Sequence, residues 1–316
     1  MQKIITTTES YSKTVRETDL RGWLADRGVE VILHYQFVAP FPFDPKDVFA
    51  IVAGHTPKGE MLHVGPGEAS FFPNLKVVSP FGVGMNHIDL IGFAAAGIDV
   101  KTLPHMSRRT VAELVFAFIF ALARRVVPQT IAIRNGEWQR QEGYLIEGKT
   151  LGIVGLGMIG KEVAKMGKAL GMVVVANDLV YDDEFNREYG IEVAEREEVV
   201  RRSDYLTLHV PLTEETDGFI NREAIKSMKR GAFFINAARG EVVDELALYR
   251  AIATEQLAGA ALDVFSEEPP FRSNVLSKLI GHPNVLSTPH IGAYTPETRY
   301  TIAKYVSEIL LPYAAP

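Results

Sequence analysis

The sequence has 316 residues, of which 47% are hydrophobic and 23% charged, and its formal net charge is −6. Such values are typical of a soluble globular protein, and this length suggests about two domains of roughly 150 residues each. The absence of cysteine excludes disulfides, thiolate metal ligands and a cysteine nucleophile, and the lack of a basic patch argues against a nucleic-acid surface.

Short apolar runs alternate with helical patterns along the first hundred residues. Runs of four to six residues rich in Val and Ile, spaced by helices, indicate βαβ units and a parallel sheet. We therefore expect residues 1–100 to form a smaller, flavodoxin-like α/β domain. The predicted strands are 3–7, 29–34, 50–53, 75–78 and 98–102, and a helix is predicted near 14–26.

A long apolar helix is predicted over 109–126. Its most apolar run, 114–123, has ten residues, which is too short to span a bilayer, and no signal peptide precedes it. A helix that is apolar on every face is normally buried in protein. We expect a core or interface helix, no membrane partner and a cytoplasmic location.

The strand pattern restarts after this helix. Six strands with intervening helices are the number in a complete dinucleotide-binding sheet, so we predict a Rossmann domain over 101–290. The final helix, 296–311, follows the last strand, and we assign 291–316 to the smaller domain. The six strands are 151–154, 173–176, 205–209, 233–236, 259–264 and 285–287, and the helices between them include 159–170, 221–228 and 244–254.

A glycine motif follows the first of these strands and opens a helix. Gly155 permits a tight turn, Gly157 lets the backbone approach a pyrophosphate, and Gly160 allows the helix to pack near the strand. The pyrophosphate would then lie on the free N–H groups of the helix N-terminus. Asp178, at the end of the next strand, is suited to a ribose and repels a 2′-phosphate, which favours NAD over NADP. The alternative is an ordinary strand–helix turn in which Asp178 caps a helix.

Three later strand ends carry unusual polar groups. Arg239 offers a planar fork for a carboxylate, and His290 is of the side-chain type that titrates near neutral pH. Glu268, if it contacts His290, would favour the imidazolium and orient the ring. Because ligands of open α/β sheets bind outside the carboxyl ends of the strands, we expect these side chains to converge with the cofactor site. Taken singly, each has an ordinary structural alternative: a surface ion pair, a turn residue or a structural histidine.

These motifs together resemble the D-2-hydroxyacid dehydrogenase family, which includes phosphoglycerate, D-glycerate and D-lactate dehydrogenases. The resemblance covers nearly the whole chain. Its strongest parts are GKTLGIVGLGMIG (148–160), HVPLTEET (209–216), MKRGAFFINAARGEVVD (228–244), ALDVFSEEP (261–269) and STPHIGA (287–293). It implies two domains, dimerisation through the cofactor domain, and hydride transfer between NAD(H) and a 2-keto or D-2-hydroxy acid.

The resemblance also implies residue roles. Arg239 binds the substrate carboxylate and carbonyl, His290 is the general acid/base and Glu268 is its partner. Val83 and Gly84 of the smaller domain face the substrate through backbone N–H groups. The residues implied at the cofactor are Gly155, Gly157, Met158, Ile159 and Gly160 at the pyrophosphate, Asp178 at the ribose, Val210 and Pro211 near the adenine, and Ala237, Ala238, Arg239, Asp263, His290, Gly292 and Ala293 at the nicotinamide end.

Departures from the family pattern leave the substrate open. Phe81 and Tyr294 stand where many members carry other residues, and His55 lies in a loop from which it could reach the substrate. Formate dehydrogenases carry glutamine at the position of Glu268, and phosphite dehydrogenases carry lysine at that of Val83, so neither is favoured. NAD-sensing corepressors of the family, which bind partner proteins, carry long tails beyond the position of Pro316. We expect a small 2-keto or 2-hydroxy acid as substrate, no metal, and a homodimer.

Overall fold

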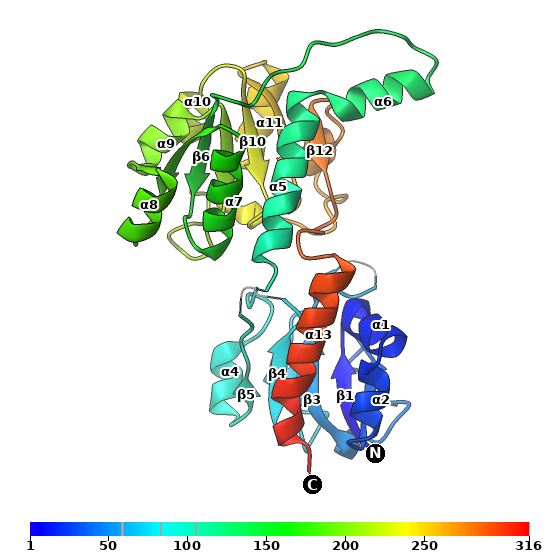
Figure 1. Ribbon diagram of the computed structural model, residues 1–316. Coiled ribbons are helices and arrows are strands. Elements are labelled where there is room, and N and C mark those ends of the chain that lie inside the picture. Colours follow the sequence, from blue (N-terminus) through cyan, green and yellow to red (C-terminus); the bar gives the residue numbers. More distant parts are fainter. Residues whose placement is uncertain (58–59, 83, 105, 316) are drawn as a thin grey trace. The chain divides into compact units, whose positions relative to one another are not determined.

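The computed structural model describes residues 1–57, 60–82, 84–104 and 106–315, which divide into two compact units (Figure 1). Unit 1 comprises Met1–Met106 and Ala293–Pro316, and unit 2 comprises Ser107–Gly292. Each unit is built on one sheet of parallel strands. None of the helices in the described ranges is long and apolar enough to cross a lipid bilayer.

The sheet of unit 1 confirms the predicted flavodoxin-like fold. Its five parallel strands run in the order β2-β1-β3-β4-β5, so the chain changes winding direction between β1 and β3. The strands are β1 (Gln2–Thr6), β2 (Val29–Leu33), β3 (Val48–Ala53), β4 (Val77–Pro80) and β5 (Asp99–Val100), and the helices are α1 (Glu9–Glu17), α2 (Leu20–Ala25), α3 (Pro66–Ala69), α4 (Leu90–Ala95) and α13 (Pro296–Leu310).

Helices α1, α2 and α13 cover one face of this sheet (Figure 1). Buried Tyr11 of α1 lies against α13, where its hydroxyl hydrogen-bonds to Ser307 Oγ at 2.8 Å. Val306 and Leu310 of α13 are fully buried in the same cluster as Ile4 of β1. The C-terminal helix is therefore an integral part of the core of unit 1.

A loop covers part of the other face of the sheet, where a helix would be usual. Residues 34–47 connect β2 to β3, and Phe37, Phe41 and Phe43 pack from this loop onto the ring of Phe72. Aromatic side chains bury large apolar areas, so the three rings cover this part of the sheet as a crossover helix would. His34 begins the loop, contacts the same three rings, and has a buried Nε2 without a hydrogen-bond partner. Burial lowers the pKa of His34.

The sheet of unit 2 has seven parallel strands in the order β12-β11-β10-β9-β6-β7-β8. Numbered along the unit, this is the Rossmann order 3-2-1-4-5-6 with a seventh strand at the far edge, and the winding direction changes between β6 and β9. The strands are β6 (Thr150–Val154), β7 (Val173–Asn177), β8 (Glu192–Val193), β9 (Tyr205–Leu208), β10 (Ala232–Asn236), β11 (Leu257–Leu262) and β12 (Val285–Ser287). The helices are α5 (Arg108–Ala123), α6 (Val126–Arg134), α7 (Met158–Ala169), α8 (Asp183–Tyr189), α9 (Arg196–Arg202), α10 (Arg222–Ser227), α11 (Glu245–Ala253) and α12 (Asn274–Ile280).

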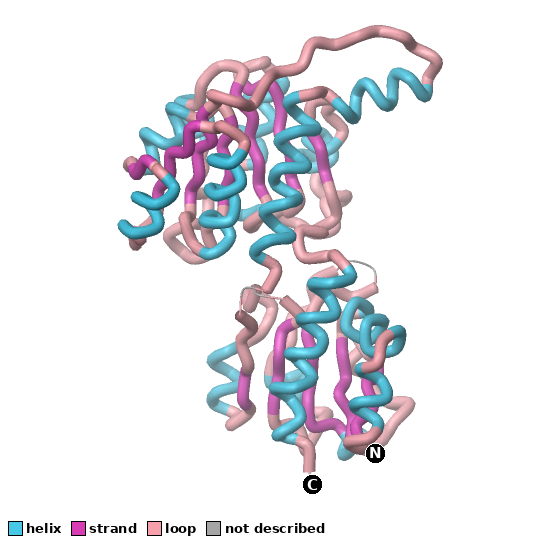
Figure 2. The backbone as a smooth tube through the Cα atoms, viewed as in Figure 1, coloured by secondary structure: helices cyan, strands magenta, loops and turns pink. Residues whose placement is uncertain are grey.

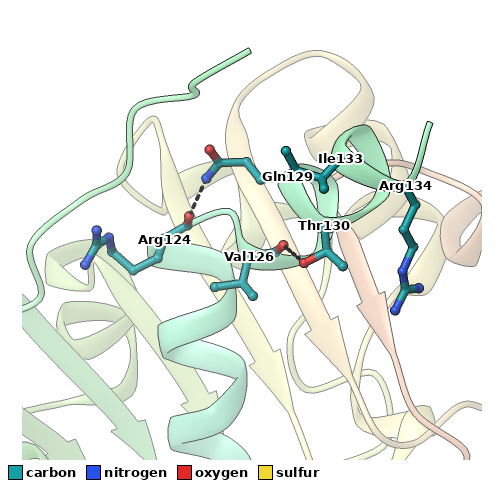
Figure 3. Close-up of a pocket in the computed structure, with 6 residues that line it drawn as sticks. All are labelled: Arg124, Val126, Gln129, Thr130, Ile133 and Arg134. Atoms are coloured by element: carbon teal, nitrogen blue, oxygen red, sulfur yellow. Dashed lines mark hydrogen bonds between the residues drawn. The ribbon is translucent and has the colours of Figure 1, made fainter. Parts of the chain in front are cut away.

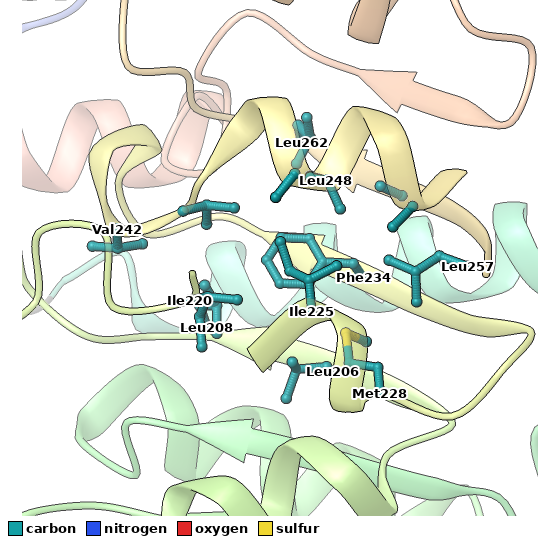
Figure 4. Packing of buried hydrophobic residues seen from close by; sticks show 14 of the residues in the cluster. Leu206, Leu208, Ile220, Ile225, Met228, Phe234, Val242, Leu248, Leu257 and Leu262 are labelled. Carbon is teal, nitrogen blue, oxygen red and sulfur yellow. The ribbon is translucent and has the colours of Figure 1, made fainter. Parts of the chain in front are cut away.

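Helices cover both faces of this sheet. On one face α5 and α7 pack over strand residues such as Ile153 and Ile235. On the other face α9, α10 and α11 enclose a cluster centred on Leu206 and Phe234 (Figure 4). Phe234 is fully buried, and its replacement by alanine would cost about 3–5 kcal/mol. The two clusters fix the sheet rigidly and thereby fix the loops at its carboxyl edge.

Several predicted boundaries were wrong. The helix predicted over 109–126 ends at Ala123, and Arg125 takes a left-handed conformation (φ 51°) before α6 begins at Val126. Six strands were predicted for the second sheet, which has seven; β8 was not predicted, because it has only two residues, both exposed, too few for a periodic pattern. The helix predicted near 14–26 is two helices, the first of which begins at Glu9.

Candidate active site

The carboxyl edge of the unit 2 sheet gathers three polar side chains. Strands β10, β11 and β12 are neighbours, and the loops that follow them carry Arg239, Glu268 and His290 respectively. The strands predicted over 205–209 and 259–264 end at Leu208 and Leu262, so His209 and Asp263 also lie in loops at this edge. Parallel strands bring all these loops to one side of the sheet.

Glu268 and His290 form a direct pair. The Nδ1 of His290 lies 2.9 Å from Glu268 Oε2, and both side chains keep part of their surface exposed, 29% and 19% respectively. With Nδ1 engaged by a carboxylate, the ring is oriented, and proton exchange with a ligand would use Nε2. The pair expected from the sequence is present.

Arg239 lies within the electrostatic reach of Glu268. Burial lowers the pKa of Arg239, and the negative charges of Glu268 and Glu241 act in the opposite direction. A guanidinium stays protonated in proteins, so Arg239 is a partly desolvated cation. Its loop is held by Asn236, which donates from Nδ2 to Arg239 O at 2.8 Å and accepts from Ala238 N at 3.0 Å. Arg239 Nη1 donates to Ala238 O at 2.5 Å.

His290 has a left-handed backbone conformation (φ 53°), which is unfavourable for a residue with a side chain. Buried Asp263 stabilises it. Asp263 Oδ1 accepts from Thr288 Oγ1 at 2.5 Å and from Ile291 N at 2.8 Å, while Oδ2 accepts from Gly292 N at 2.8 Å. The Asp263 carbonyl accepts from His290 N at 2.9 Å. Burial raises the pKa of Asp263, although these hydrogen bonds oppose the rise.

The glycine loop connects β6 to α7 and lies at the carboxyl edge of the sheet next to the end of β9, where the winding direction changes. Gly155 has φ +97°, and a Cβ there would lie 2.7 Å from the carbonyl carbon of His209. A Cβ on Gly160 would lie 2.0 Å from Gly155 O, so only glycine lets α7 approach the loop this closely. The predicted packing tasks of these two glycines agree with the geometry.

The residues at the start of α7 fit a dinucleotide. Gly157 is the N-cap of the helix and provides no side-chain cap, and a Cβ there would meet nothing within 4 Å. The first amides of α7, at Met158 and Ile159, have no partner within the helix and can donate to a pyrophosphate. Asp178 follows β7, accepts from Leu179 N at 2.6 Å through Oδ1, and is partly exposed. Thus unit 2 offers the glycine loop, the amide donors for a pyrophosphate, and the Asp178 carboxylate as an acceptor for a ribose.

Val210 and Pro211 follow β9 beside the glycine loop. A Cβ on Gly155 would lie 2.9 Å from Val210 N, and Pro211 O accepts from Thr216 Oγ1 at 2.6 Å. His209 pairs through Nε2 with Thr207 Oγ1 at 3.1 Å, and its buried Nδ1 has no partner. Burial lowers the pKa of His209 to about 3, so the ring is neutral near pH 7.

Of the remaining predicted residues, Ala237, which is partly buried, and Gly292, which ends unit 2, belong to unit 2; the others belong to unit 1. Val83 lies outside the described residues; Gly84 and Ala293 are partly exposed. Phe81 follows β4 and packs against Tyr11, with ring centroids 5.5 Å apart, and Tyr294 stacks on the guanidinium of Arg299. His55 forms a short antiparallel bridge with Met61.

Sequence reasoning gave no role to Thr288, which bonds to Asp263, or to Asn236, which holds the Arg239 loop. Both are short polar residues near a predicted catalytic residue: Thr288 lies two positions before His290, and Asn236 lies three positions before Arg239. Their position beside His290 and Arg239 in the chain was the available signal.

Comparison with known proteins agrees with this geometry. Residues 116–292 match the model of the D-isomer specific 2-hydroxyacid dehydrogenase, NAD binding domain. The chain is 39% identical over 261 residues to a glyoxylate reductase of Korarchaeum cryptofilum, a match that spans 80% of this chain and 78% of that protein. It is 42% identical over 243 residues to a D-3-phosphoglycerate dehydrogenase of Bacillus subtilis, covering 76% of this chain but only 46% of the longer relative.

Two solved structures cover nearly the whole chain. A Thermus thermophilus protein has a TM-score of 0.82 at 32% identity, over 99% of this chain and 96% of its own. The D-lactate dehydrogenase of Aquifex aeolicus, complexed with NAD and lactic acid, has a TM-score of 0.80 at 29% identity, over 98% and 94%. The chain belongs to the D-isomer specific 2-hydroxyacid dehydrogenase family of NAD-dependent oxidoreductases, and unit 2 carries the family's NAD binding domain.

Proposed function

We propose that the protein is a cytoplasmic, NAD(H)-dependent enzyme that interconverts a small 2-keto acid and the corresponding D-2-hydroxy acid. The observation that carries the proposal is the His290–Glu268 pair at 2.9 Å, on the same sheet edge as the partly buried cation Arg239. A proton donor and a carboxylate-binding cation are the two groups that reduction of a 2-keto acid requires from the protein.

In the proposed mechanism Arg239 binds the substrate carboxylate and polarises the keto oxygen. NADH, when bound, supplies the hydride for the keto carbon. His290 gives the proton from Nε2 to the keto oxygen as it becomes a hydroxyl, and Glu268 stabilises the protonated ring through Nδ1. In the oxidative direction the same nitrogen takes the hydroxyl proton.

We assign the cofactor to unit 2, with Ala293 of unit 1 as one further contact, and part of substrate binding to unit 1. The residues proposed at the cofactor are those of the glycine loop, Asp178, Val210, Pro211, Ala237, Ala238, Asp263, Gly292 and Ala293; those proposed at the substrate are Val83 and Gly84, besides Arg239 and His290. A small 2-keto acid is favoured because the relatives include proteins named glyoxylate reductase and hydroxypyruvate reductase, and a structural neighbour is named D-lactate dehydrogenase.

A panel of 2-keto acids tests the proposal. Purified protein should oxidise NADH with glyoxylate, hydroxypyruvate or pyruvate, followed by loss of NADH absorbance. The product should be the D-hydroxy acid by chiral chromatography. Protein that binds NADH in a calorimeter but oxidises none with any acid of the panel would contradict the enzymatic assignment and favour a binding protein.

We further propose a homodimer that forms through α6 of unit 2. This nine-residue helix has no buried side chain, and Val126, Ile131 and Ile133 are each at least half exposed. Helix α6 and the loop after it stand out from the body of unit 2 (Figure 2). Short helices are marginal in water without tertiary packing, so α6 needs a partner surface. A second copy of the chain is the partner that we propose, in keeping with the implied family dimer.

A hollow of roughly 680 Å³ lies along the same helix (Figure 3). Its lining combines apolar Val126 and Ile133 with Arg124 and Arg134. Light scattering should give about twice 35.0 kDa for the wild type and 35.0 kDa for Ile131→Glu/Ile133→Glu. Ile91→Glu, at an 84% exposed position of α4 in unit 1, is the matched control and should stay dimeric. A monomeric wild type would rule out the dimer.

A further inference from the structure

The loop that carries Glu268 is held from the neighbouring helix α11. Ser266 N donates to Glu245 Oε1 at 2.9 Å, and Ser266 Oγ donates to Glu245 Oε2. Two residues further along the chain, Glu268 Oε1 accepts from Phe265 N at 3.2 Å and Oε2 contacts His290 Nδ1. A short stretch of backbone therefore joins Glu245 to the His290–Glu268 pair.

The same loop packs on the backbone that follows Arg239. A Cβ on Gly240 would lie 1.9 Å from the carbonyl carbon of Phe265 and 2.1 Å from Ser266 N, so the two loops are in direct backbone contact. Glu245 lies five residues after Gly240, in the first turn of α11. Displacement of Ser266 would thus disturb the neighbourhood of both Glu268 and Arg239.

The environment of Glu245 is unfavourable for a carboxylate. Burial raises the pKa of Glu245, the Ser266 bonds oppose the rise, and the nearby negative charges of Glu241 and Asp244 add to it. Within the described ranges Glu245 forms no salt bridge. Its hydrogen bonds to Ser266 are the evident compensation for this position.

Stabilisation of α11 does not account for Glu245. Asp244 already caps this helix, because its Oδ1 accepts from Ala247 N at 2.9 Å. Both Glu245 oxygens turn outward from the helix to Ser266. A carboxylate at a helix N-terminus still contributes to stability, so the test has to separate the two effects.

We infer that Glu245 is a positioning residue that holds the Ser266 loop so that Glu268 meets His290 in the geometry for proton transfer. The inference rests on the proposed roles of Glu268 and His290. Glu245 would thus lie outside the proposed site and still determine how Glu268 is aligned with His290.

Three variants test it. Glu245→Ala removes both acceptors, and we expect kcat for keto-acid reduction to fall about ten- to hundredfold, the effect of a displacement of about 1 Å, with KM for NADH nearly unchanged. Glu245→Gln can still accept from Ser266 N and can donate to Ser266 Oγ, so it should restore most of the rate. Ser266→Ala should lose part of the rate, and its combination with Glu245→Ala should be non-additive.

The pH profile separates positioning from stability. Reduction takes a proton from the enzyme, so its rate should fall as pH rises; a poorly placed Glu268 should move this fall to lower pH in Glu245→Ala. Glu223→Ala removes a first-turn acid from α10, far from these loops in the sequence, and should leave rate and profile unchanged.

The outcomes distinguish this inference from the proposed function. If His290→Ala is inactive while Glu245→Ala keeps the wild-type kcat and pH profile, the positioning role is refuted and the enzymatic assignment stands. If His290→Ala keeps the wild-type rate, the proposed function itself fails. A Glu245→Gln variant as slow as Glu245→Ala, at wild-type thermal stability, would also refute positioning by hydrogen bonds.

Discussion

Replacement of Asp263 by asparagine should disable the histidine loop while the fold is retained. The Asp263 carboxylate accepts three hydrogen bonds, from Thr288 Oγ1, Ile291 N and Gly292 N, and so holds His290 in its left-handed conformation. That conformation costs about 1–2 kcal/mol. An amide in place of the carboxylate turns an NH₂ towards one of these donors and removes a bond to a charge, worth about 1.5–3 kcal/mol.

With about 3 kcal/mol lost and 1.36 kcal/mol per factor of ten, kcat should fall about a hundredfold. The assay is the rate of NADH oxidation with the best acid of the panel, with thermal unfolding as the test of the fold. Thr288→Val, which removes one donor and keeps the carboxylate, should fall about tenfold or less. An Asp263→Asn variant within about threefold of wild type would show that the carboxylate does not hold the loop.

Three further predictions concern the site and its stability. His290→Ala should lower kcat by about 10² to 10⁴ while calorimetry shows nearly unchanged NADH affinity. Asp178→Ala should weaken NADH binding and raise relative activity with NADPH, measured as the ratio of kcat/KM values; an unchanged ratio would exclude the ribose role. Because His34 and His209 have lowered pKa values when folded, the unfolded chain binds more protons below about pH 6.5, so acidification should lower the free energy of unfolding, by up to about 1.4 kcal/mol per pH unit for the deeply buried His209. Urea unfolding at pH 7.5 and 5 should show a smaller loss for His34→Phe than for wild type.

The parts of the fold that were predicted correctly are those with strong local signals. Strands such as Leu151–Val154 are apolar runs bounded by turn residues, and their alternation with helices determines a parallel doubly wound sheet. The break between α5 and α6 was missed because the apolar pattern continues across Arg124 and Arg125; Pro128, in the first turn of α6, was the signal that the sequence offered. Strand β8 was missed because it exists only through pairing with β7.

The site shows a similar division. Glycine spacing and the strand-end positions of Arg239, Glu268 and His290 were visible in the sequence, since each is an unusual residue type at its place. Glu245 was not visible, and Thr288 was marked only by its position near His290, because the importance of both comes from hydrogen bonds to Ser266 and Asp263 across loops distant in the chain. Such contacts depend on how loops that follow different strands are placed relative to one another in the folded sheet, which no local sequence pattern encodes.

The aromatic connection between β2 and β3 has a consequence for how unit 1 opens. Its rings are packed as a core layer, but the described backbone of 35–44 makes just one backbone–backbone hydrogen bond within this stretch, from Val38 N to Gln36 O. Amide protons here should exchange with deuterium far faster than those of β3, even though the neighbouring side chains are shielded. The aromatic side chains hold this segment in place, but its backbone has few hydrogen bonds that resist local opening. Limited proteolysis of unit 1 should therefore begin within this segment.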